Sequence, residues 1–234
     1  MLAIYKKELR SYFTTPLGYV FAAVFLAVSG AVFGVFTVQA RTSDVSTFCR
    51  MMILGYLVLL PLLTMRSFSE EKRLRTDQLI MTSPVSVTGV VMAKFLSALT
   101  VFAGCTLLTC LYYIPLSKYG NTNVPRAFGC LVAMLLVGMC FIAVGIFIST
   151  LTESQVAAAV GTMATLLVFV MISFFNGRIN SYPVRRALSW LSVYSRFTNF
   201  TYGIFDFAAL LYYLSVAAVF LFLAVRFVEK RRWA

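Results

Sequence analysis

Six long stretches of apolar residues constrain this chain more than any other feature of its sequence. They are approximately Leu17–Val38, Met51–Met65, Val91–Leu116, Ala127–Thr150, Gln155–Phe175 and Phe207–Phe227. A helix needs about 20 apolar residues to cross a bilayer. Of the 234 residues 61% are hydrophobic and 12% are charged, whereas about a quarter of a soluble domain is charged. The sequence predicts an all-α polytopic membrane protein with six transmembrane helices, and it excludes an ordinary soluble enzyme.

The first 16 residues form an amphipathic segment that we expect to lie as a helix in the membrane interface. Its charged residues are Lys6, Lys7, Glu8 and Arg10. Apolar residues recur at helical spacing on one face, at Leu2, Tyr5, Leu9, Tyr12 and Phe13. Pro16 ends this helix, because proline cannot continue a helix interior. A signal peptide is the alternative interpretation. However, Leu17–Val38 has no charged residue and is longer than a signal h-region of about 7–15 residues, which favours an uncleaved first span.

The basic residues indicate the orientation of the six spans. An even number of spans places both termini on one side, together with segments 1–16, 66–94, 151–154 and 226–234. These segments hold 12 of the 20 Lys and Arg residues, and the opposite segments hold 8. Because the cytoplasmic side carries the excess of Lys and Arg near span ends, we expect both termini in the cytoplasm.

The spans lack the groups that would let this chain power itself. When Lys94 and Arg226 are counted with the cytoplasmic segments, no Asp, Glu, Lys or Arg lies inside the six stretches, although pumps and ion-coupled transporters need such groups. The chain has no histidine, no CxxC motif and no GxxxxGK[ST] phosphate loop, so we expect no metal site and no bound nucleotide. Either the protein conducts passively or another subunit supplies the energy.

Small residues in two spans are candidates for a helix–helix interface. They are Ala27, Gly30 and Gly34 in the first span, and Ala157 and Gly161 in the fifth. Small residues let helix backbones approach closely, which stabilises helix association in lipid. A dimer seam built from spans one and five is one interpretation, and packing within a single chain is the other.

The outer segment 176–206 differs from the other outer connections, 39–50 and 117–126, which are short and polar. After breaks at Asn176-Gly177 and Pro183, apolar residues recur at helical spacing from Val184 to Tyr194. We expect a short helix on the outer leaflet here, and the alternative is a loop whose aromatic residues anchor the last span.

The segment 66–94 carries the densest charge of the chain. Its pattern predicts a helix from Phe68 to Met81, which Thr82-Ser83-Pro84 ends. Most charge runs are solvated faces. A charged helix between two spans, facing the cytoplasm, is also what a docking surface for an energising subunit requires. The candidate coupling residues are Glu70, Glu71, Lys72, Arg73, Thr76, Asp77 and Pro84, with Glu153 in the turn 151–154.

These residues resemble the cytoplasmic loop of ABC-2 type transporter permeases, in which a Glu-Glu-Arg-like cluster precedes a Gly-Thr-apolar-Glu step, a Ser/Ala-Pro-Val/Leu-Ser step and a lysine. Here the steps read Glu70-Glu71-Lys72-Arg73, Thr76-Asp77-Gln78-Leu79, Ser83-Pro84-Val85-Ser86 and Lys94. The runs at 147–159 and in the last 45 residues look like the gliding-motility (Gld-type) branch. Arg75 stands where the family often has Gly, and Asp77-Gln78 replaces the usual apolar-Glu step.

The resemblance implies one ABC-2 transmembrane domain over residues 1–234, with a connector helix, a coupling helix and short outer helices before the last span. It implies a bacterial inner-membrane exporter whose partners are two ABC ATPase subunits, a second permease subunit and a Gld-type accessory subunit. ATP and Mg would bind in the ATPase, so this chain would hold no cofactor and perform no catalysis.

Two other functions compete with the permease. A membrane-embedded lipid enzyme would need a nucleophile or paired acids, and the acidic residues near span ends, Glu153, Asp206 and Glu229, are far apart in sequence. A passive channel or scaffold would need polar or charged rings, and the Ser and Thr residues of spans three to five are sparse.

Overall fold

The computed structural model is a bundle of helices, and no strand occurs among the residues that it describes. These are residues 2–39, 45–75, 86–114, 116, 124–175, 193–201 and 206–232. Among these residues, six helices are long and apolar enough to cross a membrane. The prediction of a six-span all-helical membrane protein is therefore confirmed.

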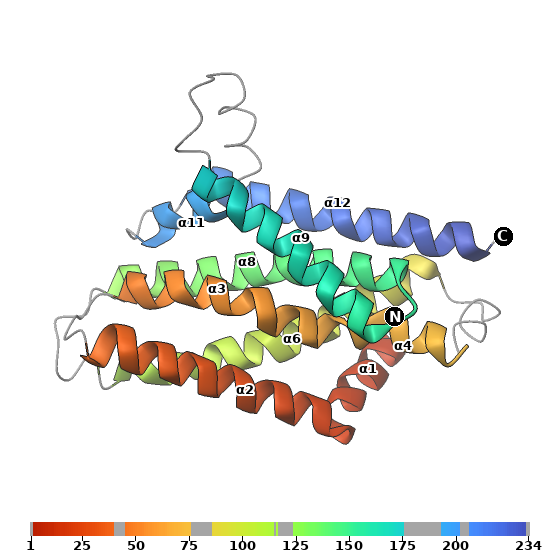
Figure 1. Ribbon diagram of the computed structural model, residues 1–234, viewed down its shortest axis with the longest axis horizontal. Coiled ribbons are helices and arrows are strands. Elements are labelled where there is room, and N and C mark those ends of the chain that lie inside the picture. The colour runs from red at the N-terminus through yellow and green to blue at the C-terminus, as the bar shows by residue number, and fades with distance from the viewer. Residues whose placement is uncertain are drawn as a thin grey trace, which may run out of the picture.

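The helices run back and forth along the long axis of the molecule (Figure 1). Their bounds are α1 Leu2–Thr14, α2 Pro16–Phe33 with the π-helix η1 Gly34–Gln39, α3 Val45–Thr64, α4 Arg66–Arg73, α6 Val87–Leu108 with the 3-10 helix η2 Thr109–Tyr112, α8 Val124–Leu151, α9 Gln155–Phe175, α11 Val193–Thr201 and α12 Phe207–Arg232. α1, α4 and the C-terminal end of α12 lie at one end of the bundle, here termed the α4 end.

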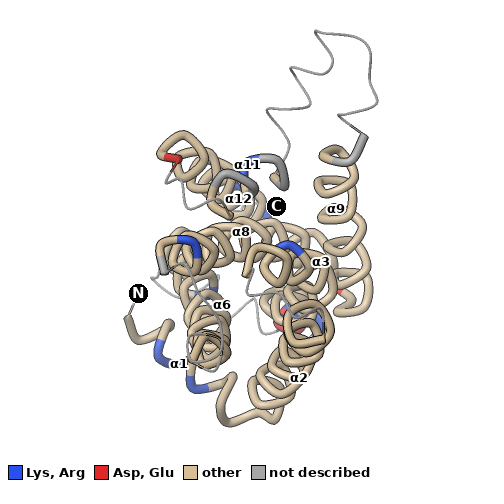
Figure 2. Tube along the Cα trace, turned by 90° about the vertical axis from the view of Figure 1, so that its left-hand side faces the viewer, with Lys and Arg blue, Asp and Glu red and all other residues tan. Residues whose placement is uncertain are grey.

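α8 is the central helix, and α3, α6, α9, α11 and α12 all pack against it (Figure 2). Two glycines of α8 permit this close packing. A Cβ at Gly138 would overlap the ring of Phe102 from α6, and a Cβ at Gly145 would overlap the side chain of Thr64 from α3. The core between these helices is aromatic, with Phe25 and Phe102 both against the buried ring of Tyr56.

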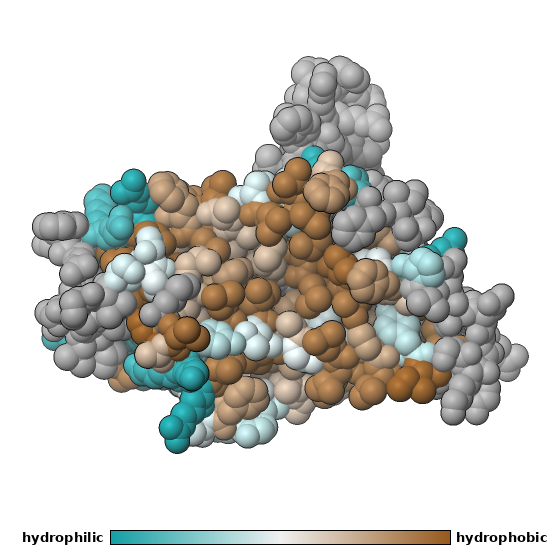
Figure 3. Space-filling view, turned by 180° about the vertical axis from the view of Figure 1, so that it is seen from behind, coloured by the Kyte–Doolittle hydropathy of each residue, from teal (hydrophilic) through white to brown (hydrophobic). Residues whose placement is uncertain are grey.

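The outer surface of the bundle is apolar around its middle, as expected for a surface that contacts lipid. Figure 3 shows brown, apolar side chains over the middle of one face and teal, hydrophilic side chains toward its ends. Fully half of α3 faces inward, whereas α2, α9 and α12 are the least buried spans. Exposed Leu54, Val58 and Leu62 recur every four residues along α3, so its outward side forms one apolar stripe.

Several predicted boundaries differ from the structure. The connector helix ends at Thr14, and Pro16 then begins α2, a position where its missing N–H costs nothing. The charged helix is α4, which begins at Arg66 rather than Phe68 and ends at Arg73 rather than Met81. Residues 76–85 lie outside the described residues, as do 176–192, which hold most of the predicted outer helix. α11 is the helix that the structure describes in that segment.

Two residues were assigned to the wrong surroundings. Lys94, which we counted with a cytoplasmic loop, lies two turns into α6 and is 2% exposed. Cys49 precedes the predicted stretch Met51–Met65, which places it in the outer connection before that span, yet it is buried inside α3. For Cys49, α3 begins at Val45, before the apolar stretch Met51–Met65, because hydropathy marks where lipid contacts a helix and not where its hydrogen bonding ends. Lys94 lies inside the stretch Val91–Leu116 itself, and its charge alone does not place it in a loop.

Candidate functional site

α4 continues from the end of α3 and is held by a hydroxyl group of the central helix. The backbone N–H groups of Phe68 and Ser69 both donate to Oγ of Ser149 on α8, at 3.0 and 3.2 Å. The first N–H groups of any helix lack partners within the helix. Ser149 therefore supplies from another span the acceptor that a capping side chain usually provides.

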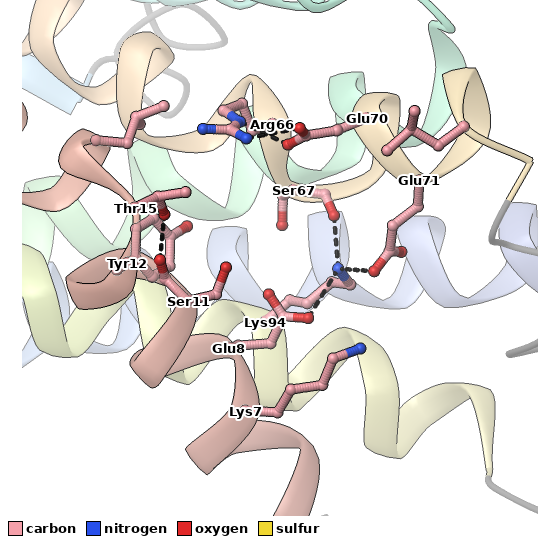
Figure 4. A pocket seen from close by; sticks show the side chains of 12 residues that line it. Lys7, Glu8, Ser11, Tyr12, Thr15, Arg66, Ser67, Glu70, Glu71 and Lys94 are labelled. Carbon is pink, nitrogen blue, oxygen red and sulfur yellow. Dashed lines mark hydrogen bonds and ion pairs between the residues drawn. The ribbon is translucent and has the colours of Figure 1, made fainter.

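Lys94 joins α4 to α6 and to α1. Its Nζ donates to Oε1 of Glu71 at 2.7 Å, to the carbonyl oxygen of Ser67 at 2.6 Å and to Oε1 of Glu8 at 3.3 Å (Figure 4). The Lys94 side chain is 3% exposed, and both carboxylates are 18% exposed. An ammonium has three protons, so each of these contacts can use one of them. We call Lys94, Glu71, Glu8 and Ser67 the Lys94 cluster.

A third contact fastens the C-terminal turn of α4. Nζ of Lys72 donates to the carbonyl oxygen of Thr150, at the end of α8, and lies 5.6 Å from the ring centroid of Phe227 on α12. The last carbonyls of a helix attract positive charge. Beside this contact, Glu153 forms an ion pair of 3.3 Å with Arg231, so the turn between α8 and α9 is linked to α12 as well.

A groove of about 400 Å³ separates α1 from α4. Lys94 forms part of its lining, and Figure 4 shows side chains of both helices pointing into it. Arg66 and Glu70 form a two-pronged ion pair on the α4 wall, with distances of 2.5 and 2.6 Å. On the α1 wall, burial raises the pKa of the Tyr12 hydroxyl well above its usual value, and that hydroxyl donates to a carbonyl of α3.

The predicted coupling residues thus divide into two groups. The carboxylates of Glu70 and Glu71 and the ammonium of Lys72 contact other residues of this chain, whereas Arg73 is exposed at the end of α4. Glu153 is exposed and belongs to the ion pair with Arg231. The other three candidates, Thr76, Asp77 and Pro84, lie outside the described residues.

The connector residues divide in the same way. Glu8 turns inward to Lys94, and its neighbours Lys6, Lys7 and Arg10 are exposed. Within the described part of the chain, the acidic side chains of α1 and α4 therefore form ion pairs with other residues of this chain. Several basic side chains of the same two helices are exposed on the surface.

Arg75 follows α4 in a left-handed conformation, with φ of 55°. In the permeases that this segment resembles, Gly often stands at this position, and a left-handed conformation favours Gly. A residue after a helix C-terminus commonly adopts this conformation, which glycine reaches without steric cost. The N–H of Arg75 closes the end of the helix by donating to the carbonyl oxygen of Lys72 at 3.1 Å.

The small residues proposed for a dimer seam do not all point the same way. Ala27 and Ala157 are exposed, and a Cβ at Gly34 would meet open space. A Cβ at Gly30 would lie 3.5 Å from the hydroxyl of Tyr112, and one at Gly161 would lie 3.2 Å from Ile148, so these two glycines contact neighbours in their own chain. α2 and α9 both pack against α3, and Figure 2 shows both on the right-hand side of the bundle.

Sequence reasoning gave no role in this site to Ser149 or to Lys94, although it named Lys94 as the lysine of the motif. Ser149 carries no signal that separates it from other hydroxyl residues of the spans. Lys94 could have been found, because a lysine inside an apolar stretch needs a partner and commonly has a functional role.

Comparison with known proteins identifies the kind of chain that carries this arrangement. A family model described as "ABC-2 family transporter protein" matches residues 45–229, from the start of α3 to near the end of α12. This is 185 of the 234 residues, and α1 and α2 precede the matched range. No curated protein matches the chain. Among the described residues, no group of three or more His, Cys, Asp and Glu could hold a metal ion.

Proposed function

The chain belongs to the ABC-2 family of transporter proteins, and on this premise we propose that it is the permease subunit of an ATP-driven exporter. Two permease subunits would form the translocation pathway, and separate ATPase subunits would bind the α4 end on the cytoplasmic side. The resemblance to the Gld-type branch supports a bacterial inner membrane and an accessory subunit.

The observation that carries this proposal is the fastening of α4 to four other helices, α1, α6, α8 and α12. Lys94 connects α4 with α6 and α1, Ser149 connects it with α8, and Lys72 contacts both α8 and α12. A force on a freely solvated loop would be absorbed by the loop. A force on α4 would instead reach the central helix and the third span, which is what an energising subunit needs.

Copurification tests the function directly. The tagged full-length chain would be extracted from the membranes of its own cells in a mild detergent. We expect an ABC ATPase subunit in the eluate, with ATP hydrolysis that vanadate inhibits. A folded chain that never retains an ATPase, and that conducts ions in liposomes on its own, would support the passive channel instead.

The orientation of the chain in the membrane can be tested separately at two exposed arginines. Arg73, at the α4 end, and Arg126, near the start of α8, are both exposed. Each would be replaced by Cys and treated with a membrane-impermeant thiol reagent. We expect Arg126→Cys to react in intact cells and Arg73→Cys to react only after permeabilisation; the reverse pattern would invert the proposed topology.

The dimer seam is tested by the residues that face outward. Leu at Ala27 or Ala157 would add bulk to a close-packed seam, whereas Ala218→Leu adds the same bulk to an exposed position of α12. We expect the first two variants to lower the dimer fraction in detergent and the third to leave it unchanged. Equal dimer fractions in all three variants would mean that spans one and five do not form the seam.

A further inference from the structure

The C-terminal end of α4 carries exposed side chains that form none of the contacts described above. Three consecutive residues there, Arg73, Leu74 and Arg75, are all exposed, and Leu74 is 63% exposed. We call them the α4 tip. No carboxylate in the described part of the chain forms an ion pair with either arginine. The tip therefore presents an apolar side chain between two guanidinium groups.

Among the described residues of α1 and α4, every acidic side chain is paired with a cation other than Arg73 and Arg75. Glu70 is engaged by Arg66, and Glu71 and Glu8 are engaged by Lys94. Charge pairs that are satisfied internally contribute little to the recognition of a partner, whereas unpaired charges steer association and select the partner's sign. Arginine is also enriched among the residues that contribute most to the binding energy of protein interfaces.

A lipid headgroup is the other candidate for these cations, and the length of α4 argues against it. The tip lies 8–10 residues beyond Met65, which corresponds to roughly 12–15 Å at 1.5 Å per residue. The headgroup layer on each side of a bilayer is only about 5–8 Å thick. In Figure 1, α4 extends past α3 along the long axis of the bundle, so the tip reaches beyond this layer.

We propose that the α4 tip binds an acidic surface of the partner ATPase, with Leu74 entering an apolar depression between that surface's carboxylates. This inference rests on the proposed function, because it identifies the chemistry of the partner's face. It also reassigns the docking role within α4: the contact is made by the cations of the tip, and Glu70 and Glu71 shape the helix from inside.

Charge reversal tests the proposal. Wild-type chain, Arg73→Glu, Arg75→Glu and the double variant would be placed in nanodiscs of neutral phosphatidylcholine, and the ATPase that copurifies with the wild type would be titrated onto each. We expect the double variant to weaken the dissociation constant at least about 10-fold at low salt, and the loss to shrink in 0.5 M salt, because salt screens exposed charges. Lys230→Glu is the matched control, since Lys230 is an exposed cation of the α4 end outside the tip.

The outcomes separate the two proposals. If the wild type binds no ATPase, both the proposed function and the tip inference fall. If the wild type binds and the reversed variants bind equally well, only the tip inference falls. If the reversed variants keep their ATPase affinity but lose a preference for phosphatidylglycerol over phosphatidylcholine, measured as lipid retained in native mass spectrometry, the tip faces lipid and the inference is overturned.

Discussion

Replacing Lys94 by Met is the perturbation that the structure describes most fully. The substitution keeps the length of the side chain and removes its charge. Two carboxylates, Glu71 and Glu8, then face each other's charge in a largely buried site without the ammonium that now lies 2.7 and 3.3 Å from them. The carbonyl oxygen of Ser67 also loses its donor.

The expected cost follows from these contacts. Removing one partner of a buried ion pair destabilises a protein by about 3–5 kcal/mol. Both carboxylates here are 18% exposed, so water or a proton can compensate part of the lost contact, and we expect about 2–4 kcal/mol. For a chain of this size each kcal/mol lowers the melting temperature by about 2–4 °C, which gives a decrease of about 4–16 °C.

Thermal unfolding of the purified chain in one detergent measures this effect. Lys7→Met is the matched control, because Lys7 lines the same groove but is exposed, and we expect a change within about 0.5 kcal/mol. The triple variant Lys94→Met/Glu8→Gln/Glu71→Gln should recover most of the loss, since it removes the whole charge network. If Lys94→Met melts like Lys7→Met, the Lys94 cluster does not hold α4 in place.

Three further substitutions test other parts of the bundle by the same unfolding assay. Ser149→Ala removes the acceptor of two α4 amides and should cost about 1–3 kcal/mol; an unchanged melting temperature would show that water replaces the hydroxyl. Gly138→Ala should cost about 1–3 kcal/mol because its Cβ would overlap Phe102, whereas Gly104→Ala, where a Cβ meets nothing within 4 Å, should be neutral or stabilising. Arg75→Gly should stabilise the chain by up to about 1 kcal/mol by relieving the left-handed conformation, and a loss of stability would contradict that reasoning.

The sequence was sufficient to predict the class of fold, because a span must be apolar over about 20 residues and hydropathy detects this directly. It also indicated the connector helix, whose charges and Pro16 leave a clear pattern. The boundaries of α4 were less accessible. Its C-terminus depends on the left-handed conformation of Arg75, and arginine gives no sign of that conformation in the way that glycine would.

The arrangement of the candidate site could not be derived from the sequence for a physical reason. Helical spacing predicts which residues share a face of α4, but it does not predict which other helix that face contacts. Glu71 looked like a docking residue because it lies in a charge run, yet its partner Lys94 is 23 residues away on another helix. The contact between Ser149 and the start of α4 joins residues about 80 positions apart. Such pairs arise only when the spans pack.

Photo-crosslinking from α4 tests most directly whether this end of the permease receives an ATPase. A photoreactive benzoyl-phenylalanine would replace Leu74, and in a second sample Arg126, both of which are exposed. After illumination of membranes from the native cells, we predict an adduct between this chain and an ABC ATPase from position 74 and none from position 126. Absence of the adduct at position 74, with the complex otherwise intact, or an equal yield at position 126 would contradict the account.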